Sequence, residues 1–224
     1  LSCNNTSGGY QRLIDGEVDV FFGAQPSTAQ QAAAQQAGRT LKLTPIGREA
    51  FVIFVNQDNP VSNLSSDQVR AIYTRQLTNW KQVGGTDEPI IAFQRPQNSG
   101  SQTIMEAKVM QGRPMATPLK EESASGMGDI LSSVADYRNS PGAIGYSFRW
   151  YATVMNAKAG LKLLSIDGVA PSVQGIRNGT YPLTVDVHAV TAGTTNPNVP
   201  KLLDWVRSAE GQALIEQVGY VGLS

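Results

Sequence analysis

The sequence has 224 residues, enough for one large domain or for two small domains that share a core. Its 18 basic residues balance 18 acidic residues without a concentrated Lys/Arg block, which argues against a nucleic-acid or membrane-surface partner. A small anion remains compatible with this balance, because backbone N–H groups and one arginine can hold it. No apolar run approaches the ~20 residues that a membrane-spanning helix needs.

In the first half of the chain, short helices alternate with short apolar strands. Residues 10–14 have helical spacing behind Thr6-Ser7-Gly8-Gly9, and Ser27 or Thr28 caps a second helix that ends at Gly38. A third helix begins at Ser65-Ser66-Asp67. The strands predicted here are residues 18–22, 41–44 and 51–55.

The second half continues the same alternation. The predicted strands are residues 90–93, 143–146, 161–166 and 183–190, and the predicted helices are residues 100–111, 127–137 and 200–218. Helices that alternate with short apolar strands indicate an α/β protein with largely parallel sheets.

Residues typical of catalysis and metal binding are sparse. The single cysteine, Cys3, excludes an intrachain disulfide, and we expect a buried or strand-end thiol, with a lipid-anchored cysteine as the minor alternative. The single histidine, His188, lies in a predicted strand and is interpreted as a packing or surface residue. No nucleophile–base pair or metal-ligand spacing is visible, so the sequence predicts a protein that is not an enzyme, with no metal and no cofactor.

Residues 95–103 follow a predicted strand and open a predicted helix. Ser99 is a natural N-cap, and Gly100 lets an anion approach the N–H groups of the first turn. Ser101 adds a hydroxyl, and Arg95 adds a fork of donors that matches an oxyanion. The segment fits a tetrahedral-anion site, and it fits a plain capped helix with a surface arginine equally well.

Thr6-Ser7-Gly8-Gly9 is a second helix start, with two hydroxyls and two glycines. Capping alone explains it. In an α/β protein, however, the loops after strand carboxyl ends face a common crevice, so two such helix starts on opposite lobes would hold one anion from both sides.

Several segments match one family in order along essentially the whole chain: residues 46–52, 59–61, 72–73, 77–85, 93–103, 142–148 and 210–212. The blocks Thr78-Asn79-Trp80…Gly84-Gly85 and Arg95-Pro96…Ser99-Gly100-Ser101 are the most specific. Together these segments resemble the substrate-binding protein of the bacterial ABC phosphate transporter.

The resemblance implies an α/β, type II periplasmic-binding-protein fold, with a ligand cleft between two α/β lobes. Lobe one would be residues 1–52 plus 187–224, and lobe two residues 53–186. The resemblance further implies an extracytoplasmic protein, in the periplasm or at the cell surface, that binds inorganic phosphate for the membrane permease of an ABC importer. It implies no nucleic-acid partner and a monomer when complete.

By position, the resemblance makes Arg95, Ser99, Gly100 and Ser101 the phosphate ligands of lobe two. Thr6, with Ser7 beside it, takes the place of a hydroxyl ligand of lobe one.

Three departures from the family bear on these expectations. The family's first strand and its Gly-Ser-Thr-type helix start have no counterpart, so we expect the chain to be a fragment of a longer folded unit, with any lipid anchor in a segment not present here. The aspartate that accepts a proton from phosphate falls at Ala24, and the acidic partner of the arginine falls at Gln97. Two alternatives therefore stay open: another tetrahedral oxyanion such as sulfate, and a non-transport sensor or scaffold domain with weakened binding.

Overall fold

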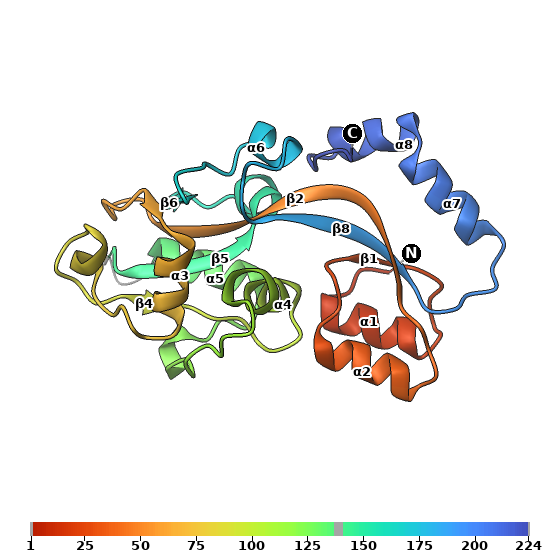
Figure 1. Ribbon diagram of the computed structural model, residues 1–224, viewed down its shortest axis with the longest axis horizontal. Coiled ribbons are helices and arrows are strands. Elements are labelled where there is room, and N and C mark those ends of the chain that lie inside the picture. Colours follow the sequence, from red (N-terminus) through yellow and green to blue (C-terminus); the bar gives the residue numbers. More distant parts are fainter. Residues whose placement is uncertain (1, 137–140, 224) are drawn as a thin grey trace. The chain divides into compact units, whose positions relative to one another are not determined.

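Figure 1 shows the computed structural model, which describes residues 2–136 and 141–223. The chain folds into two compact units. The first is formed by the residues up to Glu49, by Gln97–Thr103 and by the residues from Val185 onward. The second is formed by Ala50–Pro96 and Ile104–Thr184. The lobe boundaries that the resemblance placed near residues 52 and 187 stay a prediction.

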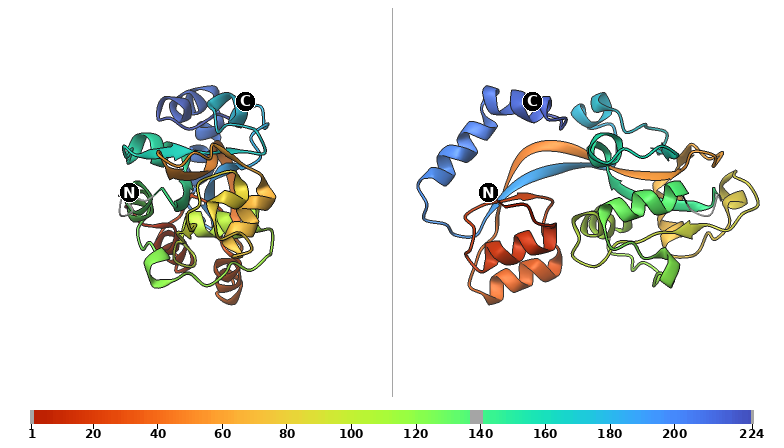
Figure 2. Two further views of the ribbon diagram at one scale, coloured as in Figure 1. Left: turned by 90° about the vertical axis from the view of Figure 1, so that its left-hand side faces the viewer. Right: turned by 180° about the vertical axis from the view of Figure 1, so that it is seen from behind.

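The first unit contains paired helices and an antiparallel strand pair. Its helices are α1 (Thr6–Ile14), α2 (Thr28–Gln36), α7 (Asn198–Arg207), α8 (Ala209–Gln217) and the start of α4 (Gly100–Ile104). Its strand β1 (Phe21–Gly23) pairs antiparallel with β8 (Thr184–Thr191). Helices α1 and α2 lie side by side in every view (Figures 1 and 2), as their mutual contacts require.

The core of the first unit begins on α1. Tyr10 and Leu13 are buried there against Val190 of β8, with the Tyr10 and Phe21 ring centroids 4.9 Å apart. The apolar spacing seen in the sequence is therefore the buried face of α1.

The second unit is built on β5 and its neighbours. Its strands are the second part of β2 (Lys42–Asn56), β3 (Asn63–Leu64), β4 (Ile91–Ala92), β5 (Ala143–Phe148), β6 (Leu161–Leu163) and β7 (Ser165–Ile166). Its α-helices are α3 (Ser66–Tyr73), α5 (Met127–Asp136) and α6 (Val173–Arg177). Its other helical turns are η1 (Trp80–Val83), η2 (Met105–Met110), η3 (Lys120–Glu122) and η4 (Tyr151–Met155).

Close packing of α5 on β5 forms the centre of this unit. A Cβ atom added at Gly145 would lie 3.0–3.1 Å from side-chain atoms of Phe54, Val134 and Ile130. Glycine at this position lets the helix approach the strand. On the other side of the strand, the Tyr146 ring lies 5.6 Å from the rings of Phe51 and Tyr73.

The prediction of largely parallel sheets is wrong. Strand β5 is antiparallel to β2 and parallel to β4, β6 is antiparallel to β2, and β3 is parallel to β7. With the antiparallel pair of β1 and β8, most of the described ladders are antiparallel. An alternation of helices and strands fixes the chain order, but it does not fix which distant strands become neighbours.

Two predicted strands, 41–44 and 51–55, are one continuous strand, β2. Pro45 and Gly47 lie between the two predicted strands. Proline is compatible with extended backbone where no N–H is needed, and the Arg48 N–H beyond it donates to the Val221 carbonyl at 2.6 Å. Three other strands also differ from the prediction. Residues 18–20 lie outside β1, and Ile90 and Phe93 lie outside β4, so these two strands are shorter than predicted. Leu164 lies between β6 and β7, so the predicted strand 161–166 is split.

The predicted helix at 200–218 is divided at Ser208. This residue has extended backbone (φ −69°, ψ 168°), and its hydroxyl accepts a 3.3 Å hydrogen bond from the Gly211 N–H, which starts α8. A Cβ atom at Gly211 would lie 2.2 Å from the Trp205 carbonyl oxygen, so the close turn requires glycine.

The position of Cys3 also differs from the prediction. It is exposed and lies outside every helix and strand, so the prediction of a buried or strand-end thiol is wrong. The predicted helix end at Tyr137 falls outside the described residues.

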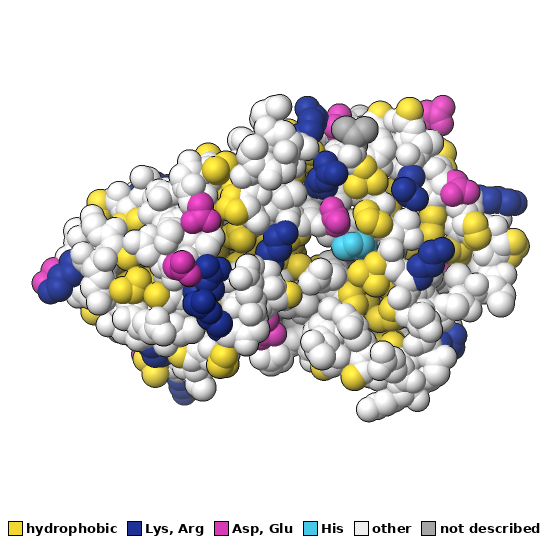
Figure 3. All heavy atoms as spheres, viewed as in Figure 1, with side chains coloured by type: hydrophobic (Ala, Val, Ile, Leu, Met, Phe, Trp, Pro, Cys, Tyr) yellow, Lys and Arg dark blue, Asp and Glu magenta, His cyan; other side chains and the backbone are white. Residues whose placement is uncertain are grey.

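In the described ranges, no helix has the length and the apolar character to cross a membrane. Figure 3 shows Lys and Arg side chains interspersed with Asp and Glu on the face drawn.

Candidate anion-binding site

The start of α4 has the capped geometry that the sequence predicted. Ser99 accepts a hydrogen bond at its hydroxyl from the Gln102 N–H (3.3 Å), and its carbonyl accepts one from the Thr103 N–H (2.9 Å). The N–H groups of Gly100 and Ser101 belong to the first helical turn, where no intrahelical carbonyl is in reach. They are available to an acceptor from outside the helix, and the positive end of the helix dipole favours an anion there.

Gly100 brings this turn directly to the Thr6 hydroxyl. A Cβ atom added at Gly100 would lie 2.6 Å from Thr6 Oγ1 and 3.5 Å from the Ala24 Cβ. All three residues belong to the first unit. Hydrogen is therefore the only side chain that fits without displacing Thr6. The two predicted helix starts are in contact here, but both belong to the first unit, whereas they were expected on opposite lobes.

The start of α1 differs from the prediction in its cap. Asn5 is the N-cap, and its side chain accepts a 2.8 Å hydrogen bond from the Gly8 N–H. Thr6 and Ser7 are then the first two helical residues, and neither hydroxyl is used for capping. Thr6 is half-buried, whereas Ser7 is exposed. Asn5 was missed although Asn is a preferred capping residue.

Ser101 and Thr103 carry buried hydroxyls in this region. Ser101 is 1% exposed, and neither its Oγ nor Thr103 Oγ1 has a hydrogen-bond partner among the described residues. Buried hydroxyls in folded proteins are nearly always hydrogen-bonded, so these two groups are candidates to bind water or a ligand.

Arg95, which follows β4, is held by groups of the second unit. Its N–H donates to the Tyr146 hydroxyl at 3.0 Å, and its Nη1 donates to the Ala124 carbonyl at 2.9 Å. Burial lowers the pKa of the Arg95 guanidinium from its ordinary value, although Asp129 and two tyrosines nearby act in the opposite direction. The side chain is thus a partly desolvated positive charge, which an anion would stabilise. Nothing in the local sequence pointed to Tyr146 or Ala124 as its supports.

Ala24 and Gln97, which stand where the family has acidic residues, lie in different surroundings. Ala24 lies beside the start of α4, and its carbonyl accepts a 2.7 Å hydrogen bond from the Tyr10 hydroxyl. Gln97 is exposed. A methyl group, and not a carboxylate, therefore faces Gly100.

His188 lies on β8 as predicted and is mostly buried, and burial lowers its pKa. Within residues 2–136 and 141–223, no group of three or more His, Cys, Asp or Glu side chains is arranged to hold a metal ion. In the first unit, the start of α4 and Thr6 carry neutral hydrogen-bond donors, and in the second unit Arg95 carries a positive charge.

Several curated relatives are similar in sequence, over different extents of the chain. The phosphate-binding protein PstS of Bacillus subtilis is 31% identical over 168 residues, which cover 75% of this chain and 53% of the relative. The protein SphX of Synechococcus elongatus is 26% identical over 100% of this chain and 68% of its own length. The chain thus spans about half of the first relative and two thirds of the second.

Solved structures are similar over nearly the whole chain. A protein assigned as the substrate-binding protein of a phosphate ABC transporter from Clostridium perfringens, solved with bound phosphate, superimposes with a TM-score of 0.78 at 23% identity, covering 98% of this chain and 85% of that one. An ABC-type phosphate transport receptor from Vibrio cholerae gives a TM-score of 0.73 at 23% identity, covering 96% and 84%. These similarities confirm the predicted α/β fold of the substrate-binding proteins. The family model described as the PBP superfamily domain matches residues 2–210, and the chain therefore belongs to the PBP superfamily.

Proposed function

We propose that this protein binds inorganic phosphate outside the cytoplasm and delivers it to the membrane permease of an ABC importer. The observation that carries the proposal is the Ser101 hydroxyl. It is buried without a hydrogen-bond partner in the described part of the chain, in the helical turn that contacts Thr6. The names of the relatives, which include phosphate-binding proteins, support phosphate as the ligand.

The proposed ligand set consists of Arg95, Thr6, Ser7, Ser99, Gly100 and Ser101. Arg95 supplies the positive charge, and its fork of N–H donors fits two oxygens of a tetrahedral anion. The hydroxyls and the first-turn N–H groups of α4 supply neutral donors. Phosphate presents acceptors on all four oxygens, so a site made almost entirely of donors is complementary to it.

Sulfate is the second candidate ligand, and the observation that favours it is Ala24. A carboxylate at this place would accept the proton of monohydrogen phosphate and would repel fully ionised sulfate. The methyl group does neither, so we propose that the site discriminates between these anions less than sites that carry the carboxylate.

Calorimetric titration of the 224-residue chain with phosphate, and separately with sulfate, tests the proposal. We expect one-to-one binding of phosphate and a higher Tm, because a ligand that binds only the folded state adds ~2.7 kcal/mol of stability at a hundredfold excess over Kd. If neither millimolar phosphate nor millimolar sulfate produces heat or a shift of Tm, the proposed transport role fails and a sensor or scaffold role is favoured. A response to sulfate alone would replace phosphate by sulfate as the ligand.

A further inference from the structure

Two polar side chains outside the proposed ligand set join the segment 97–103 to α2. The Ser27 hydroxyl donates a 2.7 Å hydrogen bond to Asn98 Oδ1, across 71 residues of sequence. The same Ser27 oxygen accepts the Gln30 N–H at 3.1 Å as the N-cap of α2. One hydroxyl thus serves both as a local cap and as a long-range contact.

The backbone at Asn98 shows that the side chain has a role of its own. Asn98 has φ of 63°, in the left-handed region that glycine adopts without strain and asparagine tolerates. Glycine would satisfy this conformation equally well, but it would not accept the bond from Ser27. The residue lies directly before the cap Ser99, so a shift of Asn98 moves the whole start of α4.

The segment that Asn98 belongs to has an unusual place in the chain. Residues 97–103 pack as part of the first unit, whereas Pro96 and Ile104 on either side belong to the second. The Ser27–Asn98 hydrogen bond and the close approach of Thr6 to Gly100 are two contacts that tie the segment to the first unit.

We propose that Ser27 and Asn98 form a positioning pair, which holds residues 97–103 so that Gly100 and Ser101 present their donors to the anion. This inference rests on the proposed function, because the effect of the pair is measured as the affinity for phosphate. Neither residue of the pair contacts the anion in this proposal.

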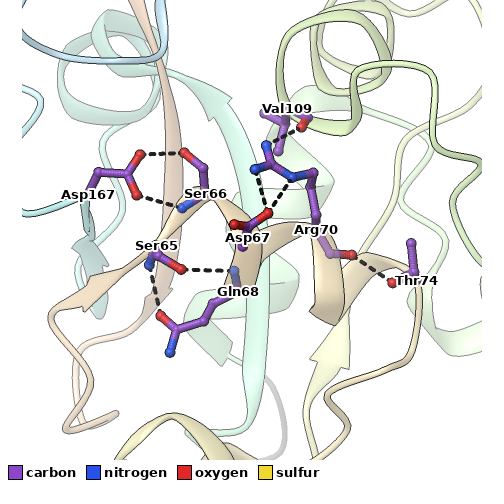
Figure 4. A network of polar contacts seen from close by, with 8 residues as sticks. All are labelled: Ser65, Ser66, Asp67, Gln68, Arg70, Thr74, Val109 and Asp167. Carbon is purple, nitrogen blue, oxygen red and sulfur yellow. Dashed lines mark hydrogen bonds and ion pairs between the residues drawn. The ribbon is translucent and has the colours of Figure 1, made fainter.

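A second capping box in the molecule provides the matched control. At the start of α3, Ser65 accepts the Gln68 N–H at 3.1 Å, and the Gln68 side chain accepts the Ser65 N–H at 2.8 Å (Figure 4). The corresponding distances for Ser27 and Gln30 are also 3.1 and 2.8 Å. Ser65 belongs to the second unit and caps its helix in the same way. Ser65→Ala therefore removes an equivalent cap without touching Asn98.

The test compares phosphate affinity in Ser27→Ala, Asn98→Gly, the double variant and Ser65→Ala by calorimetry, with the Tm of each. We expect Ser27→Ala and Asn98→Gly each to raise Kd about three- to tenfold, the range that one net hydrogen bond commonly contributes. The double variant should be no weaker than the weaker single variant, because both changes remove the same bond. Ser65→Ala should lower Tm as Ser27→Ala does and leave Kd unchanged.

Amide exchange of residues 97–103 in the phosphate-free protein separates failure of this inference from failure of the proposed function. Faster exchange is expected in Ser27→Ala and Asn98→Gly, and not in Ser65→Ala. If the wild-type chain does not bind phosphate, the proposed function fails, and exchange alone then decides whether the pair holds the segment. Unchanged exchange, losses of affinity that multiply in the double variant, or an equal loss in Ser65→Ala would each overturn the positioning pair.

Discussion

The surroundings of Arg95 and the contact of Thr6 with Gly100 are two polar regions of different character. In the second unit, a single charge is fixed by a tyrosine hydroxyl and a backbone carbonyl. In the first unit, neutral donors are crowded so closely that one added methyl group would collide with Thr6 Oγ1 at 2.6 Å. The two regions therefore differ in how they would bind the proposed anion. The attraction between Arg95 and an anion would depend little on the exact shape of the site. Binding by closely packed neutral donors would depend almost entirely on that shape.

Removal of the charge should have the largest effect. Arg95→Ala is expected to weaken phosphate binding by ~2–5 kcal/mol, as when one partner of a buried charged pair is truncated. Arg95→Lys keeps the charge but loses the fork of donors, so its affinity should lie between those of the wild type and Arg95→Ala. Calorimetry measures both. Lys81→Ala, which removes a solvent-exposed cation that pairs with Asp87, is the control and should bind normally. Wild-type affinity in Arg95→Ala would remove this residue from the site.

Crowding at the first unit is tested by Gly100→Ala. The added Cβ must displace Thr6, and overpacking of this kind typically costs ~1–3 kcal/mol. We expect a lower Tm and weaker phosphate binding. Thr6→Ala in the same chain removes the colliding oxygen, so the double variant should recover its Tm but not its affinity. Unchanged Tm and affinity in Gly100→Ala would show that the close approach is not needed.

Ser101→Ala distinguishes a ligand from a structural hydroxyl. Because Ser101 Oγ has no described partner, its removal should leave the phosphate-free Tm unchanged or slightly higher. Affinity for phosphate should fall by ~1 kcal/mol, the typical net contribution of one hydrogen bond. Thermal melting with and without phosphate measures both quantities. A fall of Tm in the absence of phosphate would assign the hydroxyl to the fold.

The smallest expected effect is on selectivity. Ala24→Asp adds a carboxylate next to Gly100, where it would accept the proton of monohydrogen phosphate and repel sulfate. We expect sulfate to compete less effectively with phosphate in the variant than in the wild type, as measured by competition titration. Sulfate that is already wholly ineffective against the wild type would contradict the weaker discrimination proposed for Ala24.

Local signals in the sequence predicted the elements of the site well. The expected caps were Ser27 or Thr28, the run Ser65-Ser66-Asp67, and Ser99. In the structure, Ser27, Ser65 and Ser99 accept the first-turn N–H that defines a cap. Capping depends on residues three positions apart, so a single sequence contains the information. Asn5 was overlooked because Thr6 and Ser7, two further capping residues, follow it directly.

Long-range features were not predictable in the same way. The pairing of β5 with β2 and the contact of Ser27 with Asn98 join residues that are far apart in the chain, and no local pattern encodes them. The division of the last helix was predictable in principle, since Ser208 stands three residues before Gly211. The apolar spacing continues across Ser208, however, and favoured one helix.

The irregular helix that follows the candidate site affects what a one-residue deletion there would do to the site. Helix α4 continues into η2, a π-helix of Met105–Met110 in which Met105, Val109 and Met110 are buried. Each bond from i to i+5 spans one residue more than the i to i+4 bond of an α-helix, so a π-helical turn accommodates a one-residue insertion. Deletion of one exposed residue here, such as Lys108, would restore α-helical bonding and leave the two ends of the helix oriented as they are, whereas the same deletion in an α-helix would turn them by about 100° relative to each other. A single-residue gap at η2 would therefore leave the start of α4 in contact with Thr6, so sequences with and without the extra residue would present the same first-turn donors.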